Sequence, residues 1–278
     1  MRLRAIVIAL ALAAAPAVLG ACEGEPPKTA LGYTEDAKRA YDAAMQAYNG
    51  HNWIEAETLL REVKRKYSYS KYAKLAELRL ADADFEQEKF PEAIREYKDF
   101  IHAHRSDAEE VAYAHSRIAE ALYAQIPDSA LLPASEERDQ AGVIDAYREL
   151  KSYLADYPDS KTSPHIRELL AEVIARLVRH ELYVARFYLK KDNYDAAIAR
   201  IQYALRNYAS PSDVSLAATV AGGGLQAEAL LLLGQTYLKM HQWNEARQAF
   251  ETLLRGYARS PLAVQARGYL DFLGGRGA

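Results

Sequence analysis

The sequence contains one cysteine, Cys22, and only 14 glycines and 10 prolines among its 278 residues. A single cysteine cannot form an internal disulfide, and it has no second cysteine with which to build a zinc or redox site. Glycine and proline are scarce while Ala, Leu, Glu, Arg and Lys are abundant, so the composition favours helix. Strand-type alternation is hard to find after residue 30, and we therefore expect an all-α protein.

The chain also lacks an excess of basic residues, with 35 basic against 38 acidic side chains and a formal net charge of −3. Without Arg2 and Arg4, which we expect to be removed with a signal peptide, 33 basic against 38 acidic side chains leave −5. A general nucleic-acid binder would show a clustered basic excess, so we expect no nucleic-acid partner. The balance equally disfavours a polybasic membrane-surface patch. Attachment to a membrane must come from another feature.

The amino terminus reads MRLRAIVIALALAAAPAVLGAC over residues 1–22. A basic start precedes an apolar stretch that is short for a membrane-spanning helix and ends in small residues, which predicts a signal peptide over residues 1–21. The last four residues, Leu19-Gly20-Ala21-Cys22, resemble the bacterial lipobox. The thiol of Cys22 is then the nucleophile that accepts diacylglycerol, and several acyl chains on one residue anchor a protein stably. The alternative is an ordinary secreted protein with a chance cysteine.

The residues after Cys22 concern sorting and spacing. Glu23 stands where an aspartate is associated with retention in the inner membrane, so sorting to the outer membrane is the better prediction. Residues 22–32 are polar and include a Pro26-Pro27 pair, which predicts an extended lipidated tether before the folded part.

A repeated pattern runs through the rest of the chain. Alanines follow a larger residue by three positions in five pairs: Trp53–Ala56, Phe90–Ala93, Val143–Ala146, Tyr194–Ala197 and Trp243–Ala246. Large or apolar residues recur four, seven and eleven positions after these alanines, as in Leu60, Val63 and Tyr67 of the first pair. This spacing marks one face of a helix, and the alanine must be small because a neighbouring helix crosses closely there.

The pattern resembles the second helix of the tetratricopeptide repeat, so we expect a superhelix of about five helical hairpins. The alanines lie 37, 53, 51 and 49 residues apart, more than the usual period of roughly 34. Insertions account for the excess, and we place them at residues 125–139, 164–191 and 210–224. Units 1–3 would occupy residues 33–160, and units 4–5 with a capping helix after Pro261 would occupy residues 161–278.

No catalytic signature accompanies the repeats. The seven histidines form no HExxH motif and no cluster with metal-ligand spacing, and His104 takes a repeat position where tyrosine stands in other units. The three consecutive glycines at residues 222–224 lack the Lys-Ser or Lys-Thr of a phosphate-binding loop. We therefore expect a binding protein with no cofactor and no metal. A lipid-anchored enzyme that uses histidines and carboxylates at its surface is the alternative from another class.

A peptide-binding groove is the main candidate site. Against the repeat frame, three residues of the first helix point to the concave face, and unit two places three residues comparably, with Arg79 adjacent. They are Tyr41, Met45 and Tyr48, then Leu78, Arg79, Asp82 and Phe85. Such an aromatic and amphipathic surface suits an extended peptide that carries aromatic residues. Packing between repeats is the alternative role for each of them.

Several stretches resemble the BamD family, the lipoprotein subunits of the outer-membrane β-barrel assembly machinery. They are RHELYVARFYLKKDNYDAAIARIQYALRNY at 179–208, KYSYSKYAKLAEL at 66–78, SEERDQ at 135–140 and DYPDS at 156–160. The first is similar to that family's long fourth hairpin. Departures are Ser68, where the family usually has proline, and the glycine-rich loop before unit five.

The resemblance implies a scaffold on the periplasmic face of the outer membrane. Its partners would be the BamA-type barrel subunit, other assembly lipoproteins and unfolded outer-membrane proteins. By position, Arg200 is the candidate for a charge contact with the BamA-type subunit. The alternative is another periplasmic tetratricopeptide lipoprotein, either a pilotin-like factor for a secretin or a coordinator of cell-wall synthesis.

Overall fold

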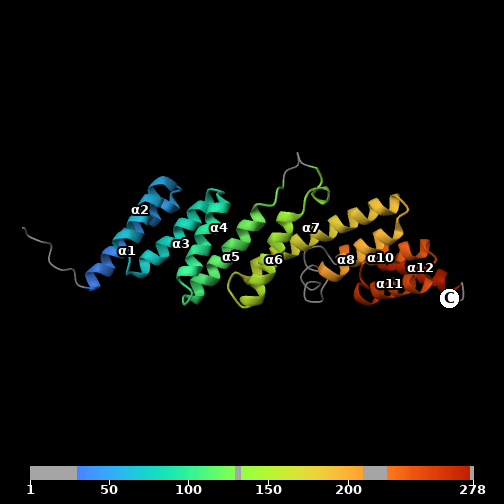
Figure 1. The fold of residues 1–278 in the computed structure, drawn as a ribbon. Helices are drawn as coiled ribbons and strands as arrows, with labels where there is room; N and C mark the ends of the chain where they lie inside the picture. Colours follow the sequence, from blue (N-terminus) through green and yellow to red (C-terminus); the bar gives the residue numbers. More distant parts are fainter. Residues whose placement is uncertain (1–29, 129–132, 209–223, 276–278) are drawn as a thin grey trace, which may run out of the picture.

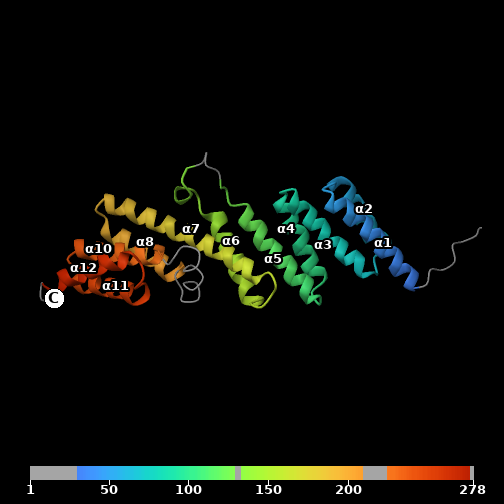
Figure 2. The same cartoon turned by 180° about the vertical axis from the view of Figure 1, so that it is seen from behind.

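The computed structural model describes residues 30–128, 133–208 and 224–275, and every regular element in these ranges is a helix. Figures 1 and 2 show the helices lying side by side in one elongated row, from α1 at the N-terminal end to α12 at the C-terminal end. The predicted signal peptide, Cys22 and all but the last residue of the glycine-rich loop lie outside the described residues. The all-α prediction is confirmed.

In the described part of the chain, five helical hairpins follow one another. They are α1 (Ala30–Asn49) with α2 (Trp53–Lys66), α3 (Lys71–Glu86) with α4 (Phe90–Ala103), α5 (Ala108–Ala124) with α6 (Ala141–Asp156), α7 (Ser163–Lys190) with α8 (Tyr194–Tyr208), and α10 (Gly224–Lys239) with α11 (Trp243–Gly256). A last helix, α12 (Leu262–Gly274), packs on α10 and α11 and covers the end of the row. The predicted tetratricopeptide superhelix with a capping helix is confirmed.

The repeated alanine pattern marks the buried face of every second helix. All five alanines are fully buried, and the residues four and seven positions later are at most 3% exposed. In unit five the small residue on the facing helix is Gly234, where a Cβ atom would clash with the ring of Phe250. Each alanine or glycine therefore sets how closely the two helices of a hairpin approach.

The turn inside a hairpin has the same backbone geometry in four of the five units. A residue with positive φ stands two positions before the aromatic residue that begins the second helix; these residues are His51, Glu88, Asp192 and His241. In the first unit, the N–H of His51 donates to Tyr48 O at 2.9 Å and that of Asn52 donates to Ala47 O at 3.0 Å. These bonds close the end of the first helix, as in a Schellman motif. The third unit differs because its hairpin contains the predicted insertion.

That insertion packs on α7. The short 3₁₀-helix η1 (Ser135–Glu137) lies within it, and the Glu136 carbonyl is 2.7 Å from Nδ1 of His180 on α7. Before η1, Asp128 accepts a hydrogen bond of 3.2 Å from Arg176 of α7. The 28 residues of α7 confirm the predicted long fourth hairpin, and this length gives the insertion a surface to cover.

The start of the first helix differs from the expected boundary. Helix α1 begins at Ala30, so the last three residues of the expected tether are helical, and the Thr34 hydroxyl donates to Ala30 O at 3.0 Å. Ala30 and Leu31 are good helix formers, which explains the earlier start. The expected division between units three and four, at residue 160, lies in the turn between α6 and α7, and one hydrophobic cluster extends across it from Ala119 to Ala249. Units three to five therefore share a core.

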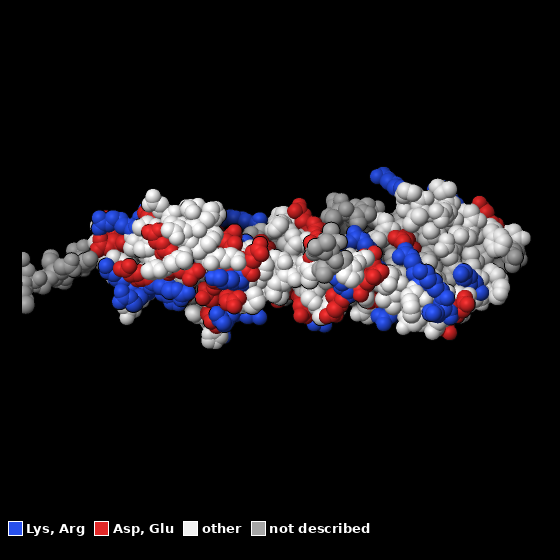
Figure 3. Space-filling view, turned by 90° about the horizontal axis from the view of Figure 1, so that it is seen from above, with Lys and Arg blue, Asp and Glu red and all other residues white. Residues whose placement is uncertain are grey.

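Charges of both signs are distributed along the row. On the face shown in Figure 3, basic and acidic side chains alternate over most of the length, so neither sign dominates that face. Among the described helices, none has the length and apolarity needed to cross a bilayer.

Candidate functional site

Helices α3, α4 and α5 surround a buried carboxylate with polar side chains. Asp82 lies on α3, which packs against α1 and α4, and only 1% of its surface is exposed. A buried carboxylate is strongly destabilising unless hydrogen bonds and opposite charges compensate it. Because Ala81 and Ala83 flank it, neighbouring helices can approach closely enough to supply both.

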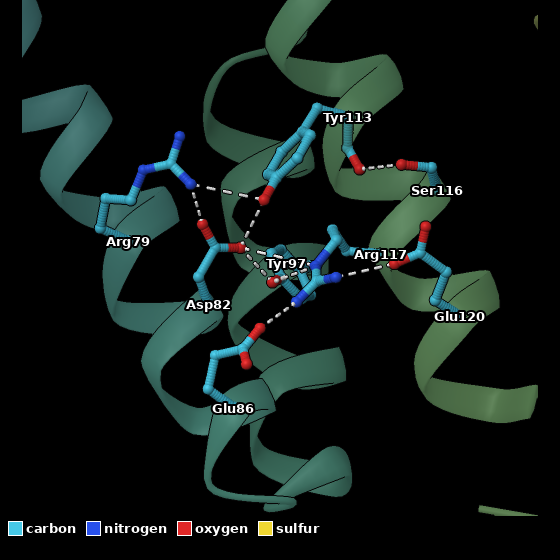
Figure 4. Close-up of polar contacts among 8 residues, drawn as sticks. All are labelled: Arg79, Asp82, Glu86, Tyr97, Tyr113, Ser116, Arg117 and Glu120. Carbon is cyan, nitrogen blue, oxygen red and sulfur yellow. Dashed lines mark hydrogen bonds and ion pairs between the residues drawn. The ribbon is translucent and has the colours of Figure 1, made fainter. Parts of the chain in front are cut away.

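Four side chains from three helices bind this carboxylate (Figure 4). Arg79, one turn earlier on α3, forms an ion pair with Oδ2 through Nη1. The hydroxyls of Tyr97 on α4 and Tyr113 on α5 both donate to Oδ1, the second at 2.9 Å. Nε of Arg117 on α5 lies 3.8 Å from the same oxygen. Asp82 therefore fixes the relative positions of α3, α4 and α5.

Arg117 extends the cluster toward two further carboxylates. Its Nη2 lies 3.1 Å from Glu86 and its Nη1 lies 2.8 Å from Glu120. Its guanidinium carbon also stands 3.6 Å above the ring of Phe85, a cation–π contact. With Arg79 and Asp82, the cluster holds two guanidinium groups and three carboxylates, so both arginines are fixed in place before any ligand binds.

Burial and charge shift several pKa values in this region. The pKa of Tyr48 is raised to about 12, mainly by burial and further by the carboxylates of Asp82 and Glu86, against the opposing effect of the arginines. Burial also raises the pKa of Tyr113, with Asp82 adding to the shift. For Arg79, burial alone would lower the pKa, but Asp82, Tyr113 and Tyr41 outweigh it and the pKa is raised. At neutral pH the tyrosines are therefore neutral donors and the arginine is charged.

The structure corrects two of the predicted groove residues. Leu78 is 2% exposed and packs in a hydrophobic cluster with Tyr97 and Ile118. Asp82 is the buried centre of the polar cluster described above. Neither side chain can line an open groove. The reason is that α3 packs between α2 and α4 and also contacts α1, so fewer of its faces are free than a lone hairpin suggests.

The remaining predicted residues are half-buried on α1 and α3 around the cluster. Tyr41 lies with its ring centre 5.6 Å from that of Tyr72, and Tyr48 stands edge-on to Trp53 at 5.3 Å. Met45 lies one turn after Tyr41 on α1 and is also half-buried. Arg79 keeps 30% of its side chain exposed. These residues occupy one region, and their role as a peptide groove stays a prediction.

Sequence reasoning missed five members of the cluster, namely Tyr97, Tyr113, Arg117 and the two glutamates Glu86 and Glu120. Tyr97 stands at a repeat position and was expected only to fill the core. The available signal was Arg117 itself, because an arginine between Ser116 and Ile118 in an apolar helix requires a buried acidic partner.

A hollow adjoins the cluster on its C-terminal side. It has a volume of about 530 Å³ and lies between the start of α5 and the α6–α7 turn, with Ala112, Tyr113, Tyr157 and Pro158 among its walls. Tyr113 therefore connects the polar cluster to a largely apolar space that has room for a large side chain.

The predicted partner contact Arg200 lies on α8 and is exposed at one end of an intramolecular ion pair. Its Nη1 is 3.4 Å from Glu181 of α7, with 45% of the arginine side chain exposed against 8% of the glutamate. Arg200 is therefore accessible, but it also compensates a buried carboxylate. A substitution of Arg200 therefore also leaves the carboxylate of Glu181 without its counter-charge.

The histidines are placed in packing and hydrogen-bonding roles. The ring centre of His104 lies 4.5 Å from that of Phe100, and its Nε2 is 2.7 Å from Glu77. Across residues 30–128, 133–208 and 224–275, no group of three or more His, Cys, Asp or Glu side chains could hold a metal ion.

Comparison with known proteins identifies the family. The family model YfiO, described as an outer membrane lipoprotein, matches residues 34–221. The chain belongs to this family. It is 26% identical over 245 residues to the outer membrane protein assembly factor BamD of Caulobacter vibrioides, covering 88% of this chain and 73% of that protein. It is 22% identical over 257 residues to BamD of Neisseria gonorrhoeae, covering 89% and 90% of the two chains.

The resemblance to the BamD family is thus confirmed. Among solved structures, a thermophilic tetratricopeptide protein from Thermus thermophilus aligns with a TM-score of 0.32 and 17% identity, covering 84% of this chain and 98% of that one. The assignment of the fold rests on the repeat geometry described above.

Proposed function

We propose that this YfiO-family protein is a lipid-anchored scaffold for outer membrane protein assembly. Cys22 carries the lipid, and the helical row lies on the periplasmic face of the outer membrane. The C-terminal units bind a BamA-type barrel subunit and other assembly lipoproteins, while the N-terminal units bind unfolded outer-membrane proteins. Membership of an outer membrane lipoprotein family and the BamD relatives support this role.

The observation that carries the peptide-binding part is the fixed arginine beside two tyrosines. Arg79 uses Nη1 for both Asp82 and Tyr113, so its other nitrogens can donate to Tyr41 or to a carbonyl or carboxylate of a bound peptide. Tyr41 and Tyr48 add ring surface on the facing helix. A held guanidinium next to aromatic rings suits an extended segment that carries aromatic residues, since little side-chain entropy is lost on binding.

Crosslinking to a C-terminal peptide of a barrel protein tests this site. We expect the Tyr41→Ala, Tyr48→Ala double variant to crosslink at least tenfold less than the wild-type chain. The matched control is Tyr183→Ala with Tyr203→Ala, which removes two tyrosines that are 41% and 42% exposed on α7 and α8. Equal crosslinking by both double variants, with helicity retained, would refute the proposal that Tyr41 and Tyr48 line a peptide-binding groove. Loss of folding in the first variant would show that its tyrosines serve packing between repeats.

The partner contact at Arg200 needs a variant that leaves the protein stable. Arg200→Glu would place two carboxylates beside each other, because Glu181 is 8% exposed behind it. Replacing both, Glu181→Gln with Arg200→Gln, removes the two charges, keeps the shape of the buried side chain at 181 and leaves a shorter polar side chain at the exposed position 200. We expect this variant to bind a purified BamA-type subunit at least fivefold more weakly, while Arg206→Gln on the same helix binds normally. Unchanged affinity of the double variant would refute the proposed contact between Arg200 and the BamA-type subunit.

The scaffold role as a whole is tested by purifying the lipidated protein in detergent and identifying what accompanies it. Recovery of a BamA-type barrel subunit is the expected result. Its absence, when the protein is produced at its natural level and is folded, would refute the role.

A further inference from the structure

The turn between α2 and α3 concentrates positive charge that the overall composition conceals. Residues 64–71 read KRKYSYSK, with four basic and no acidic side chains, in a chain whose acidic residues outnumber its basic ones. The balance that disfavoured a membrane-surface patch is a sum over the chain, and it does not describe this turn. We call residues 64–71 the basic turn.

The basic turn also exposes an aromatic side chain without a structural reason. Tyr69 is 97% exposed, and Leu31 near the start of α1 is 71% exposed. Both lie at the same end of the first hairpin, where α1 begins and α2 ends (Figures 1 and 2). The rings of Tyr33 and Tyr67, 5.4 Å apart, join these two segments. An exposed tyrosine and leucine beside lysines is the composition of a protein surface at lipid headgroups.

The basic side chains are available for a partner. Within the described residues, Arg65, Lys66 and Lys71 form no ion pair, and the two lysines lie over the rings of Tyr67 and Tyr72. Arg65 and Lys66 lie in the last turn of α2, where basic side chains complement the helix dipole, and this accounts for their presence. Lys71 begins α3, where the dipole disfavours a cation. Fold stability therefore does not explain it.

The turn also encloses space for a headgroup. A hollow of about 370 Å³ is lined by Tyr69, Lys71 and Lys74, together with Lys64 and Glu77. Lys64 and Glu77 pair with each other at 3.1 Å, and Lys74 pairs with Asp107 and Glu110. Lys71 is left as the uncompensated charge of the hollow, which favours an anion over a cation there.

We propose that the basic turn, with Leu31, is a second membrane contact that binds the anionic phospholipid surface. The proposal rests on the proposed lipid anchor at Cys22, which lies eight residues before Ala30. Eight extended residues span at most about 28 Å, so the anchor keeps this end of the row close to the bilayer. A lipid chain and a basic patch together hold a protein more firmly than either alone, and they also orient it. The elongated row then leads away from a fixed point at the membrane.

Vesicle binding by the chain without its lipid, residues 23–278, tests the proposal apart from the anchor. This chain contains every described helix. We expect it to sediment with vesicles of phosphatidylethanolamine and phosphatidylglycerol at low salt, and to be released as salt rises. Vesicles of phosphatidylcholine should retain little of it. The Lys66→Glu, Lys71→Glu variant should bind the anionic vesicles at least tenfold more weakly, because each basic side chain near such a surface contributes about a fivefold change.

The matched control is Lys190→Glu with Lys191→Glu, which makes the same change of charge at the α7–α8 turn. This control should bind within twofold of the unchanged chain. Equal losses in the two double variants would show a mere effect of net charge and would overturn the proposal, as would absence of binding to anionic vesicles at low salt. Labelled palmitate in cells tests Cys22 separately: a chain without label that still binds vesicles would refute the anchor and leave the basic turn standing.

Discussion

Replacing Asp82 by asparagine should destabilise the N-terminal half of the protein. Asparagine keeps one oxygen that can accept from Tyr97 and Tyr113, so the shape of the site survives. The other oxygen becomes an amide group, which points N–H donors at Arg79. The variant therefore tests the charge at the centre of the cluster with little change in volume.

The magnitude follows from how deeply each partner is buried. Removing one member of a buried ion pair typically costs about 3–5 kcal/mol, because the other charge is left uncompensated. Here Arg117 retains Glu86 and Glu120, and Arg79 can turn toward water because 30% of its side chain is exposed. Both facts favour the lower end, and we expect a loss of about 3 kcal/mol. For a protein of this size that lowers the Tm by about 6–12 °C.

Thermal and urea unfolding followed by circular dichroism measure this loss, and the chain contains its own control. Asp145 pairs with Arg148 at the same spacing of three residues on α6, but 61% of its side chain is exposed. Asp145→Asn should change stability by less than about 0.5 kcal/mol. Similar effects of the two substitutions, or a loss below about 1 kcal/mol for Asp82→Asn, would refute the account of Asp82 as a structural centre.

Two further predictions concern packing and pH. Gly234→Ala should destabilise the protein by about 1–3 kcal/mol in urea unfolding, because the added Cβ meets the ring of Phe250. The control is Gly268→Ala on α12, where there is open space and we expect a gain of about 0.5–1 kcal/mol. Stabilisation by both substitutions would refute the close approach of α10 and α11 at Gly234. Because folding raises the pKa of Tyr48 to about 12, stability should fall as pH rises from about 10 to 12, where the unfolded chain ionises first. Tyr48→Phe should reduce that fall, and an ultraviolet titration should lose one late-ionising tyrosine.

The sequence predicts the fold well because the alanine pattern reports a local property. The buried face of a helix follows from the spacing of residues along that helix, so the buried positions in all five units could be predicted without knowing which helices pack together. The two insertions in units three and four were located because they interrupt that spacing. The start of α1 was expected too late because Gly32 was assigned to the tether, although Ala30 and Leu31 before it favour helix.

The site was predicted less completely because it depends on three helices at once. Tyr41 and Tyr48 were assigned from the expected direction of their side chains on one helix, and Arg79 as a neighbour of such positions. Leu78 and Asp82 were assigned to the same surface, since a pattern within one helix does not show which of its faces α1, α2 and α4 cover. Arg117 was missed because two of its three acidic partners, Asp82 and Glu86, come from another unit of the repeat.

The net charge of the chain does not reveal the polar cluster around Asp82 or the basic turn, on which the proposed functions depend. Arg79 and Arg117 are matched by carboxylates and hold helices in place, while Lys66 and Lys71 are unmatched and remain free for a partner. The array also separates these regions, because each unit packs mainly on its neighbours and the clusters around Leu60, Tyr97 and Ile201 are distinct. Peptide binding, membrane contact and partner binding can therefore be changed one at a time. A variant of Lys66 and Lys71 that lost the BamA-type partner in detergent solution would contradict this separation.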